Sequence, residues 1–190
     1  MTRTKKNFEN YGKELFGAIQ NVDEKILNEA INCILKKIKQ KKQIFICGNG
    51  GSAAIANHYV ADYLKLLREK TKVKTKIISL SSSIELITAI SNDRNYDQIF
   101  SYQLESLANK GDLLILISSS GNSKNIVNAL KYAKKNSIST IGFSGFSGGY
   151  LKKNCDISLH YENKSYQLSE DYHHILMHFI MIELINNLNK

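Results

Sequence analysis

The stretch 43-QIFICGNGGSAAIANHYVAD-62 contains, in order, a short apolar run, a glycine-rich turn and the beginning of a helical pattern. Residues 43–48 are mostly apolar, which is typical of a strand buried on both faces of a parallel sheet. Helical spacing of apolar residues then returns over residues 52–67. A buried strand that passes through a turn into a helix is the repeating unit of parallel α/β proteins.

The same alternation of strands and helices continues on both sides of this stretch. Apolar spacing predicts a helical segment over residues 8–42, and a break at residues 21–23 indicates two helices with Asn21 or Asp23 as a cap. Further strands are predicted at residues 75–80, 113–118, 138–144 and 156–161, and further helices at residues 83–91, 98–108, 124–136 and 168–189. The segment 145-GFSGGY-150 is predicted to form a loop. We therefore expect one domain, residues 1–190, in which an N-terminal helical part (1–42) precedes an α/β core (43–190) with a parallel sheet covered on both faces.

Composition and charge are those of an ordinary globular chain. The 190 residues are 43% hydrophobic and 23% charged, and no apolar run approaches the roughly 18–20 residues that cross a bilayer. The N-terminal residues contain no apolar signal-peptide core. The chain has an odd number of widely spaced cysteines, Cys33, Cys47 and Cys155, which is typical of buried thiols in a reducing compartment. We therefore expect a cytoplasmic protein. The formal net charge is +9, but the lysines are scattered, which favours steering of an anionic substrate over a nucleic-acid surface.

Two strand-to-helix turns carry groups that suit a phosphate. In the first, Gly48, Gly50 and Gly51 let the backbone approach a ligand, and Ser52 opens the next helix, whose N-terminus favours an anion. The second turn, 118-SSSGNS-123, supplies the hydroxyls of Ser118, Ser119, Ser120 and Ser123. The alternative interpretation is that the glycines only form turns and the serines only cap helices. Neither turn fits the GxGxxG or GxxxxGK(S/T) pattern, and two hydroxyl-rich loops at one end of a sheet favour a phosphorylated small molecule.

The chain contains, in order, GNGGSAA with a following histidine, TAISND, SSSGNS, a GG loop and a histidine-bearing last helix. These motifs and their order resemble those of the sugar isomerase (SIS) domain family, and more narrowly its sedoheptulose 7-phosphate (phosphoheptose) isomerases. The resemblance implies an SIS-type three-layer sandwich with a five-stranded parallel sheet and N-terminal helices used in oligomerisation. It also implies a homotetramer with active sites between subunits, a divalent metal that is usually zinc, and no organic cofactor. The implied reaction is aldose–ketose isomerisation of a sugar phosphate through an enediol, most narrowly of sedoheptulose 7-phosphate to D-glycero-D-manno-heptose 7-phosphate for surface polysaccharide.

The resemblance also implies a role for each matching residue. Sugar hydroxyls would be contacted by Asn49 and Asp93. The metal would be bound by His58, Asp62, Glu170 and His178, with Asp62 as the base, His178 as the acid and Glu170 as a rival base. The phosphate would be held by Ser52, Ser118, Ser119, Ser120 and Ser123, beside the backbone of Gly50 and Gly51.

Three positions depart from the family's pattern. The family's glutamate four residues after the first histidine is Asp62 here, and its glutamine in the last helix is Glu170. Two carboxylates would add negative charge around the metal and could change which metal is preferred. The family's arginine eight residues after the first histidine is Leu66, so Lys65 or Arg68 would take over its substrate contact.

Helix geometry supports part of this metal set. His58 and Asp62 are four residues apart and share one helix face. Glu170 and His178 are eight residues apart, roughly 12 Å along a regular helix. They reach one ion only if their side chains converge, if the helix begins after Glu170, or if different subunits contribute. His174 lies four residues from each and faces the same way, which makes it a competing ligand.

Two alternative functions remain open. The same scaffold could isomerise or epimerise another phosphosugar, or the chain could be a non-catalytic SIS module that binds or senses a sugar phosphate. Such a module would need the phosphate loops but not the histidines and carboxylates. Four candidate ligands in register therefore favour catalysis.

Overall fold

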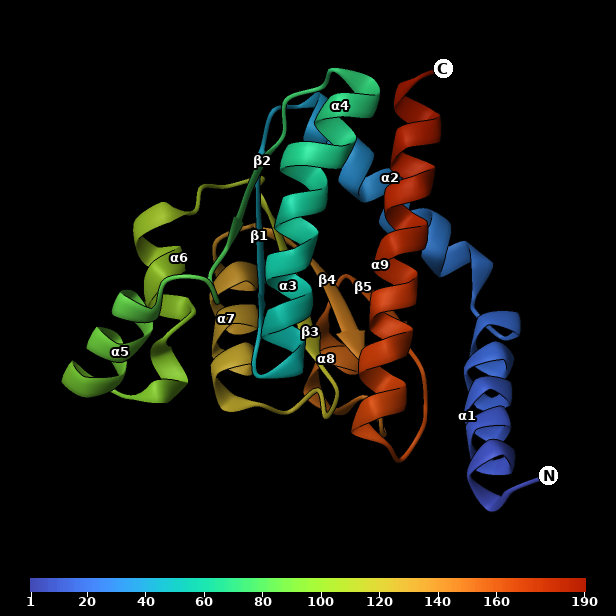
Figure 1. Ribbon diagram of the computed structural model, residues 1–190. Helices are drawn as coiled ribbons and strands as arrows, with labels where there is room; N and C mark the ends of the chain where they lie inside the picture. The colour runs from blue at the N-terminus through green and yellow to red at the C-terminus, as the bar shows by residue number, and fades with distance from the viewer.

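The computed structural model describes residues 1–190 and contains one five-stranded sheet with the strand order β2-β1-β3-β4-β5 (Figure 1). All neighbouring strands are parallel, which confirms the predicted α/β fold class. The strands are β1 (Gln43–Gly48), β2 (Lys76–Ser79), β3 (Leu113–Ser118), β4 (Ser139–Ser144) and β5 (Ile157–His160). None of the helices combines the length and the apolar character needed to span a membrane.

The helices occupy the segments between the strands and both ends of the chain. They are α1 (Arg3–Gln20), α2 (Glu24–Lys39), α3 (Gly51–Ala61), α4 (Arg68–Thr71), α5 (Ile84–Asp93), α6 (Ser101–Leu107), α7 (Lys124–Lys135), α8 (Gly149–Asn154) and α9 (Tyr166–Leu188), with a π-helical segment η1 (Asp62–Leu67) and a 3-10 turn η2 (Tyr96–Gln98). The predicted break in the N-terminal helical part is confirmed. Asn21 ends α1, and the Asp23 carboxylate accepts a hydrogen bond from the Ile26 backbone N–H to begin α2.

Two local predictions need correction. The segment predicted as a loop, residues 145–150, contains the start of α8, whose six residues are too few to show apolar periodicity. The helix predicted for residues 52–67 runs without a break through α3, η1 and α4 to Thr71. It ends where Lys72 adopts a left-handed conformation with φ 63°.

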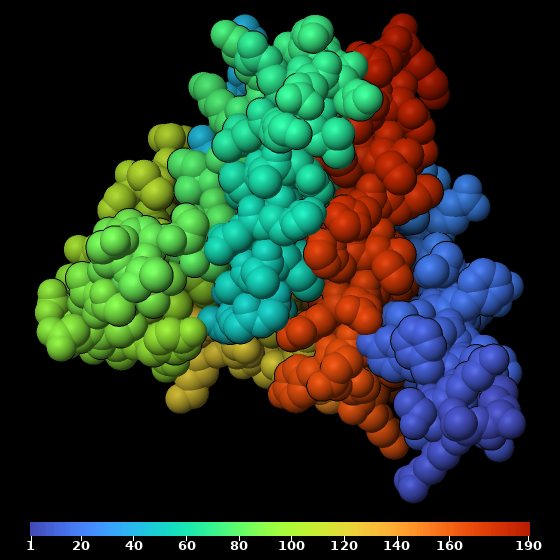
Figure 2. Space-filling model, in the orientation of Figure 1, coloured from blue at the N-terminus to red at the C-terminus, as the bar shows by residue number.

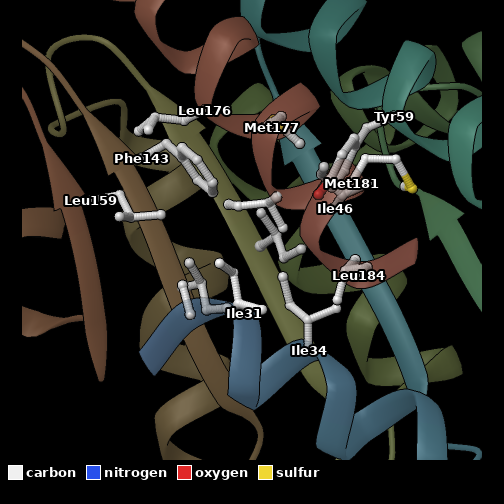
Figure 3. Close-up of a cluster of buried hydrophobic side chains, with 14 of the residues drawn as sticks. Ile31, Ile34, Ile46, Tyr59, Phe143, Leu159, Leu176, Met177, Met181 and Leu184 are labelled. Carbon is white, nitrogen blue, oxygen red and sulfur yellow. The ribbon is translucent and has the colours of Figure 1, made fainter. Parts of the chain in front are cut away.

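Helices cover both faces of the sheet, as predicted. On one face, α2, α3 and α9 pack over buried apolar side chains that include Ile34, Ile46 and Met177 (Figure 3). On the other face, α5, α6, α7 and α8 pack over a second cluster that includes Leu130 and Leu151. Each fully buried aliphatic side chain contributes about 1.5–3 kcal/mol, so packing on the sheet fixes which residues of α9 turn towards α3.

The strand order creates a crevice at one end of the sheet. The chain leaves β1 through α3 and returns as β2 on one side, whereas β3 lies on the other side of β1. The helices that follow β1 and β3 therefore cover opposite faces, and their loops separate at the carboxyl ends of the strands. Gly48 pairs with Ile117 there, which brings the glycine turn and the serine loop together.

The first helix projects from the body of the molecule (Figures 1 and 2). Ala18 is the single buried residue of α1. Contact with the body is made largely through α9, where the Tyr11 hydroxyl donates a hydrogen bond to the Asp171 carboxylate. Apolar side chains of α1 such as Phe8 and Phe16 are exposed.

Candidate active site

A small pocket lies at the carboxyl ends of β1 and β3, where both loops had been predicted to bind phosphate. Its volume is about 110 Å³. It is lined by Asn49, Ser52, Ile117, Ser118, Ser119, Ser120, Ser123, Tyr166 and Glu170, and is called the serine pocket below. The two loops therefore converge on one cavity. Tyr166 belongs to no motif, and nothing in the sequence marks it as a lining residue.

Two helices that begin beside the serine pocket, α3 and α7, receive no hydrogen bond from an N-cap side chain. Among the helices of ten residues or more, α1, α2, α5 and α9 each begin with a side chain that accepts a backbone N–H, whereas α3 and α7 do not. Ser123 occupies the cap position of α7 without making that bond. The interpretation that the serines only cap helices is therefore wrong for Ser123. The N-termini of α3 and α7 therefore both adjoin the serine pocket through Ser52 and Ser123, and helix N-termini favour an anion. In α7 the Ile126 N–H is already paired, because it donates to the Asn125 side chain over 2.9 Å.

The serine loop, residues 118–123, is held in place by the first turn of α8 and by Gly148 before it. Gly121 has φ +65°, and a side chain there would overlap the carbonyl oxygen of Gly148. The Leu151 backbone N–H donates to the Gly121 carbonyl over 3.1 Å, and the Tyr150 backbone N–H donates to the Asn122 side chain over 2.8 Å. The start of α8 thus fixes the conformation of the serine loop.

Asn49, predicted to contact sugar hydroxyls, is fixed by two residues that the sequence analysis missed. Its side-chain amide forms a reciprocal pair of hydrogen bonds with Asn125, with N–O distances of 3.0 and 2.9 Å. The Tyr96 hydroxyl donates to the same Asn49 oxygen over 2.9 Å. Asp93 lies in the same polar segment as Tyr96, but it is exposed at the end of α5 and does not line the serine pocket. Its substrate contact stays a prediction.

Three histidines meet between α3 and α9. Ligand nitrogens of His58, His174 and His178 all lie within 4.8 Å of one another, and these residues are called the imidazole cluster below. The Nε2 atoms of His58 and His178 are 3.3 Å apart. Asp62, the first residue of η1, places its Oδ2 atom 3.6 Å from His58 Nε2 and 3.8 Å from His178 Nε2. A π-helical turn is uncommon and often occurs at a functional site.

The imidazole cluster has the donor set of a divalent-metal site. Burial and the neighbouring His178 and His58 lower the pKa of His174, which favours the neutral imidazole that binds metals. The Nε2 atom of His174 is buried and has no hydrogen-bond partner. Imidazole nitrogens together with a carboxylate oxygen suit zinc.

The serine pocket and the imidazole cluster both lie along the contact between α3 and α9, which is called the α3–α9 seam below. Figure 1 shows α3 and α9 side by side, and both helices begin at the end where the serine pocket lies. His58 is six residues beyond Ser52, about 9 Å by helix rise, and His174 is four residues beyond Glu170, about 6 Å. These are distances that one open-chain sugar phosphate spans.

Two other predicted residues occupy different surroundings. The Glu170 carboxylate lies against Gly51 and lines the serine pocket, and its role as a metal ligand stays a prediction. Lys65 is exposed on η1, where its Nζ atom is 3.9 Å from the Glu69 carboxylate. It does not line the serine pocket, and its substrate contact also stays a prediction.

Comparisons with known proteins identify a family model, relatives and a solved structure that are similar to this chain. Residues 7–145 match the family model of the SIS domain. The chain is 42% identical over 133 residues to the phosphoheptose isomerase of Campylobacter concisus, covering 70% of each protein. It is 40% identical over 162 residues to that of Aliarcobacter butzleri, covering 85% of this chain and 84% of the relative. The solved structure of phosphoheptose isomerase from Neisseria gonorrhoeae superposes with a TM-score of 0.85 at 27% identity and covers 97% of both chains.

Proposed function

The chain belongs to the SIS domain family, and on that premise we propose that it is a phosphoheptose isomerase that interconverts sedoheptulose 7-phosphate and D-glycero-D-manno-heptose 7-phosphate. One observation carries the proposal. The serine pocket and the imidazole cluster share the α3–α9 seam, so a phosphate held at one end leaves the other end of the sugar beside His58, Asp62 and His178. A module that only bound a sugar phosphate would not need this second group.

The phosphate end is recognised by hydroxyls and backbone N–H groups. Ser119, Ser120 and Ser123 donate to phosphate oxygens, together with the uncapped N-termini of α3 and α7. Asn49, held by Asn125 and Tyr96, contacts a sugar hydroxyl at the rim. Because these donors are fixed before the substrate arrives, little ordering entropy is lost on binding.

Proton transfer takes place at the other end of the seam. Asp62 removes a proton from the carbon next to the carbonyl through a carboxylate oxygen, and His178 returns a proton to the neighbouring carbon. His58 and His178, together with Asp62, would hold a divalent metal, with zinc expected. When bound, it would supply Lewis-acid stabilisation of the negative charge on the substrate oxygens.

The proposal also includes a homotetramer located in the cytoplasm. The exposed apolar residues of α1, among them Phe8 and Phe16, support its use in a homotetramer with active sites between subunits. The three cysteines form no disulfide, which fits a reducing cytoplasm.

The proposal is tested by giving metal-loaded protein a panel of five- to seven-carbon ketose and aldose phosphates and reading the products by NMR. Conversion of sedoheptulose 7-phosphate is expected, and in D₂O one carbon-bound deuterium should enter the product, because the proton that His178 delivers is taken from solvent. Unphosphorylated sedoheptulose is the matched control and should react far more slowly. Absence of turnover across the panel, with metal bound, would favour the sugar-phosphate-binding module.

A further inference from the structure

Glu170 and His174 lie on successive turns of α9 but contact different parts of the seam. A Cβ atom on Gly51 would overlap the carboxylate of Glu170, so this carboxylate sits directly against the first residue of α3. Gly51 and His58 are seven residues apart on that helix, roughly 10 Å by helix rise. The Glu170 carboxylate therefore lies at the phosphate end of the seam, away from the level of His58.

His174 lies at the other end, within the imidazole cluster. Its ring centroid is 5.0 Å from that of His58 and 4.4 Å from that of His178. Its Nε2 atom is buried without a hydrogen-bond partner, which costs free energy unless a ligand satisfies it.

We propose that His174 is the third imidazole ligand of the metal and that Glu170 is a specificity residue of the serine pocket. The metal would then be held by the imidazoles of His58, His174 and His178 and by the Asp62 carboxylate, a donor set that suits zinc. The role of Glu170 towards the substrate rests on the proposed function, whereas the metal assignment does not.

The Glu170 carboxylate should determine which anions bind in the serine pocket. The residues lining the pocket include no lysine, arginine or histidine, so the Glu170 charge is not neutralised there. A phosphate group carries about −1.5 to −2 charges and, like a carboxylate, only accepts hydrogen bonds in that form. Bare inorganic phosphate is therefore repelled. A sugar phosphate compensates, because a hydroxyl near its phosphate donates to the carboxylate. Glu170 thus selects polyhydroxy phosphates over inorganic phosphate.

The metal assignment is tested by titrating Co²⁺ or Zn²⁺ into full-length His174→Ala, Glu170→Ala and, as a positive control, His58→Ala, because alanine removes the donor atoms. We expect His174→Ala and His58→Ala to weaken metal binding by at least about tenfold, and Glu170→Ala to change it by less than about twofold. Circular dichroism shows whether each variant is folded. Unchanged affinity in folded His174→Ala, or an equal loss in Glu170→Ala, overturns the assignment.

The pocket assignment is tested by calorimetric titration of inorganic phosphate into the protein. The titration is made once with metal bound and once in excess chelator, because only phosphate that binds the metal is lost when the metal is removed. Glu170→Gln should bind phosphate about tenfold more tightly than the unmodified chain, because one nearby repulsion is removed. Glu162→Gln makes the same charge change at an exposed position outside the pocket and should leave binding unchanged. Equal phosphate affinity in Glu170→Gln and the unmodified chain overturns this part. Neither titration depends on catalysis. Both therefore give a result even if the protein does not isomerise the proposed substrate, and a failure of that activity is distinguished from a failure of these assignments.

Discussion

The Nε2 atoms of His58 and His178 lie 3.3 Å apart, although 120 positions separate the two residues in the chain. Two neutral imidazoles can share only one proton at this distance, and an Asp62 carboxylate oxygen lies within 3.8 Å of both rings. Such a group is maintained because α3 and α9 are both anchored in the core beneath them, through residues such as Tyr59 and Met177. The three side chains therefore act as one chemical unit.

Asp62→Asn should lower the isomerisation rate by about 100-fold or more, because an amide cannot accept the substrate proton. Its stability should change little, since the carboxylate makes no hydrogen bond to the backbone. NMR of product formation and of deuterium incorporation measures the effect, and Glu105→Gln, at an exposed position of α6, is the control. If Asp62→Asn and Glu170→Gln both keep full activity, the acid–base assignment is wrong.

Serine-to-alanine changes should separate substrate binding from helix capping. Ser123→Ala removes a pocket hydroxyl that makes no capping bond, so we expect KM for the sugar phosphate to rise with little loss of stability. Ser83→Ala removes a hydroxyl that accepts the Leu86 backbone N–H, so it should cost about 1 kcal/mol of stability and leave KM unchanged. Steady-state kinetics and urea unfolding of both variants are the measurements. The same KM in Ser123→Ala and the unmodified protein would argue against the phosphate site.

The fold class and the two loops expected to bind phosphate were predictable from local sequence patterns. A strand of the β3 type is recognised from its own residues, and the loop after it must lie at the carboxyl edge of a parallel sheet. The imidazole cluster depends instead on how α9 is rotated against α3, which is set by tertiary packing. Helix periodicity identified His174 as a competitor of Glu170 but could not show which of them faces His58. Tyr166 and Asn125 enter the site through tertiary contacts alone, so no motif marks them.

Acid should destabilise the protein through His173. Burial lowers the pKa of this residue from 6.5 to about 4, and the nearby His160 adds to the effect. Between these values the unfolded chain binds a proton that the folded chain does not, so the free energy of unfolding falls as the pH drops from 6.5 to 4, by up to about 3 kcal/mol. Urea unfolding of the full chain across this range measures the slope.

His173→Leu is the matched variant for this measurement, because leucine is apolar and does not titrate. The free energy of unfolding of this variant should fall less steeply than that of the unmodified protein between pH 6.5 and 4. At pH 8, where His173 is neutral in both the folded and the unfolded chain, the difference in stability between the two proteins measures only the change in core packing. Parallel pH profiles for the two proteins would mean that His173 does not contribute to acid sensitivity.

The N-terminal helix should control assembly. Phe16 and Ile19 lie three residues apart on α1, with 59% and 41% of their surface exposed, and so form part of an apolar face that nothing in the chain covers. A Phe16→Glu/Ile19→Lys double variant should therefore lower the mass in solution from that of an oligomer towards the 21.5 kDa of one chain, measured by light scattering during size-exclusion chromatography. Lys13→Glu changes charge on the same helix without removing apolar surface and should stay assembled. A double variant with the mass of the unmodified protein would place the interface elsewhere. Because the proposed active sites lie between subunits, dissociation should also reduce isomerisation.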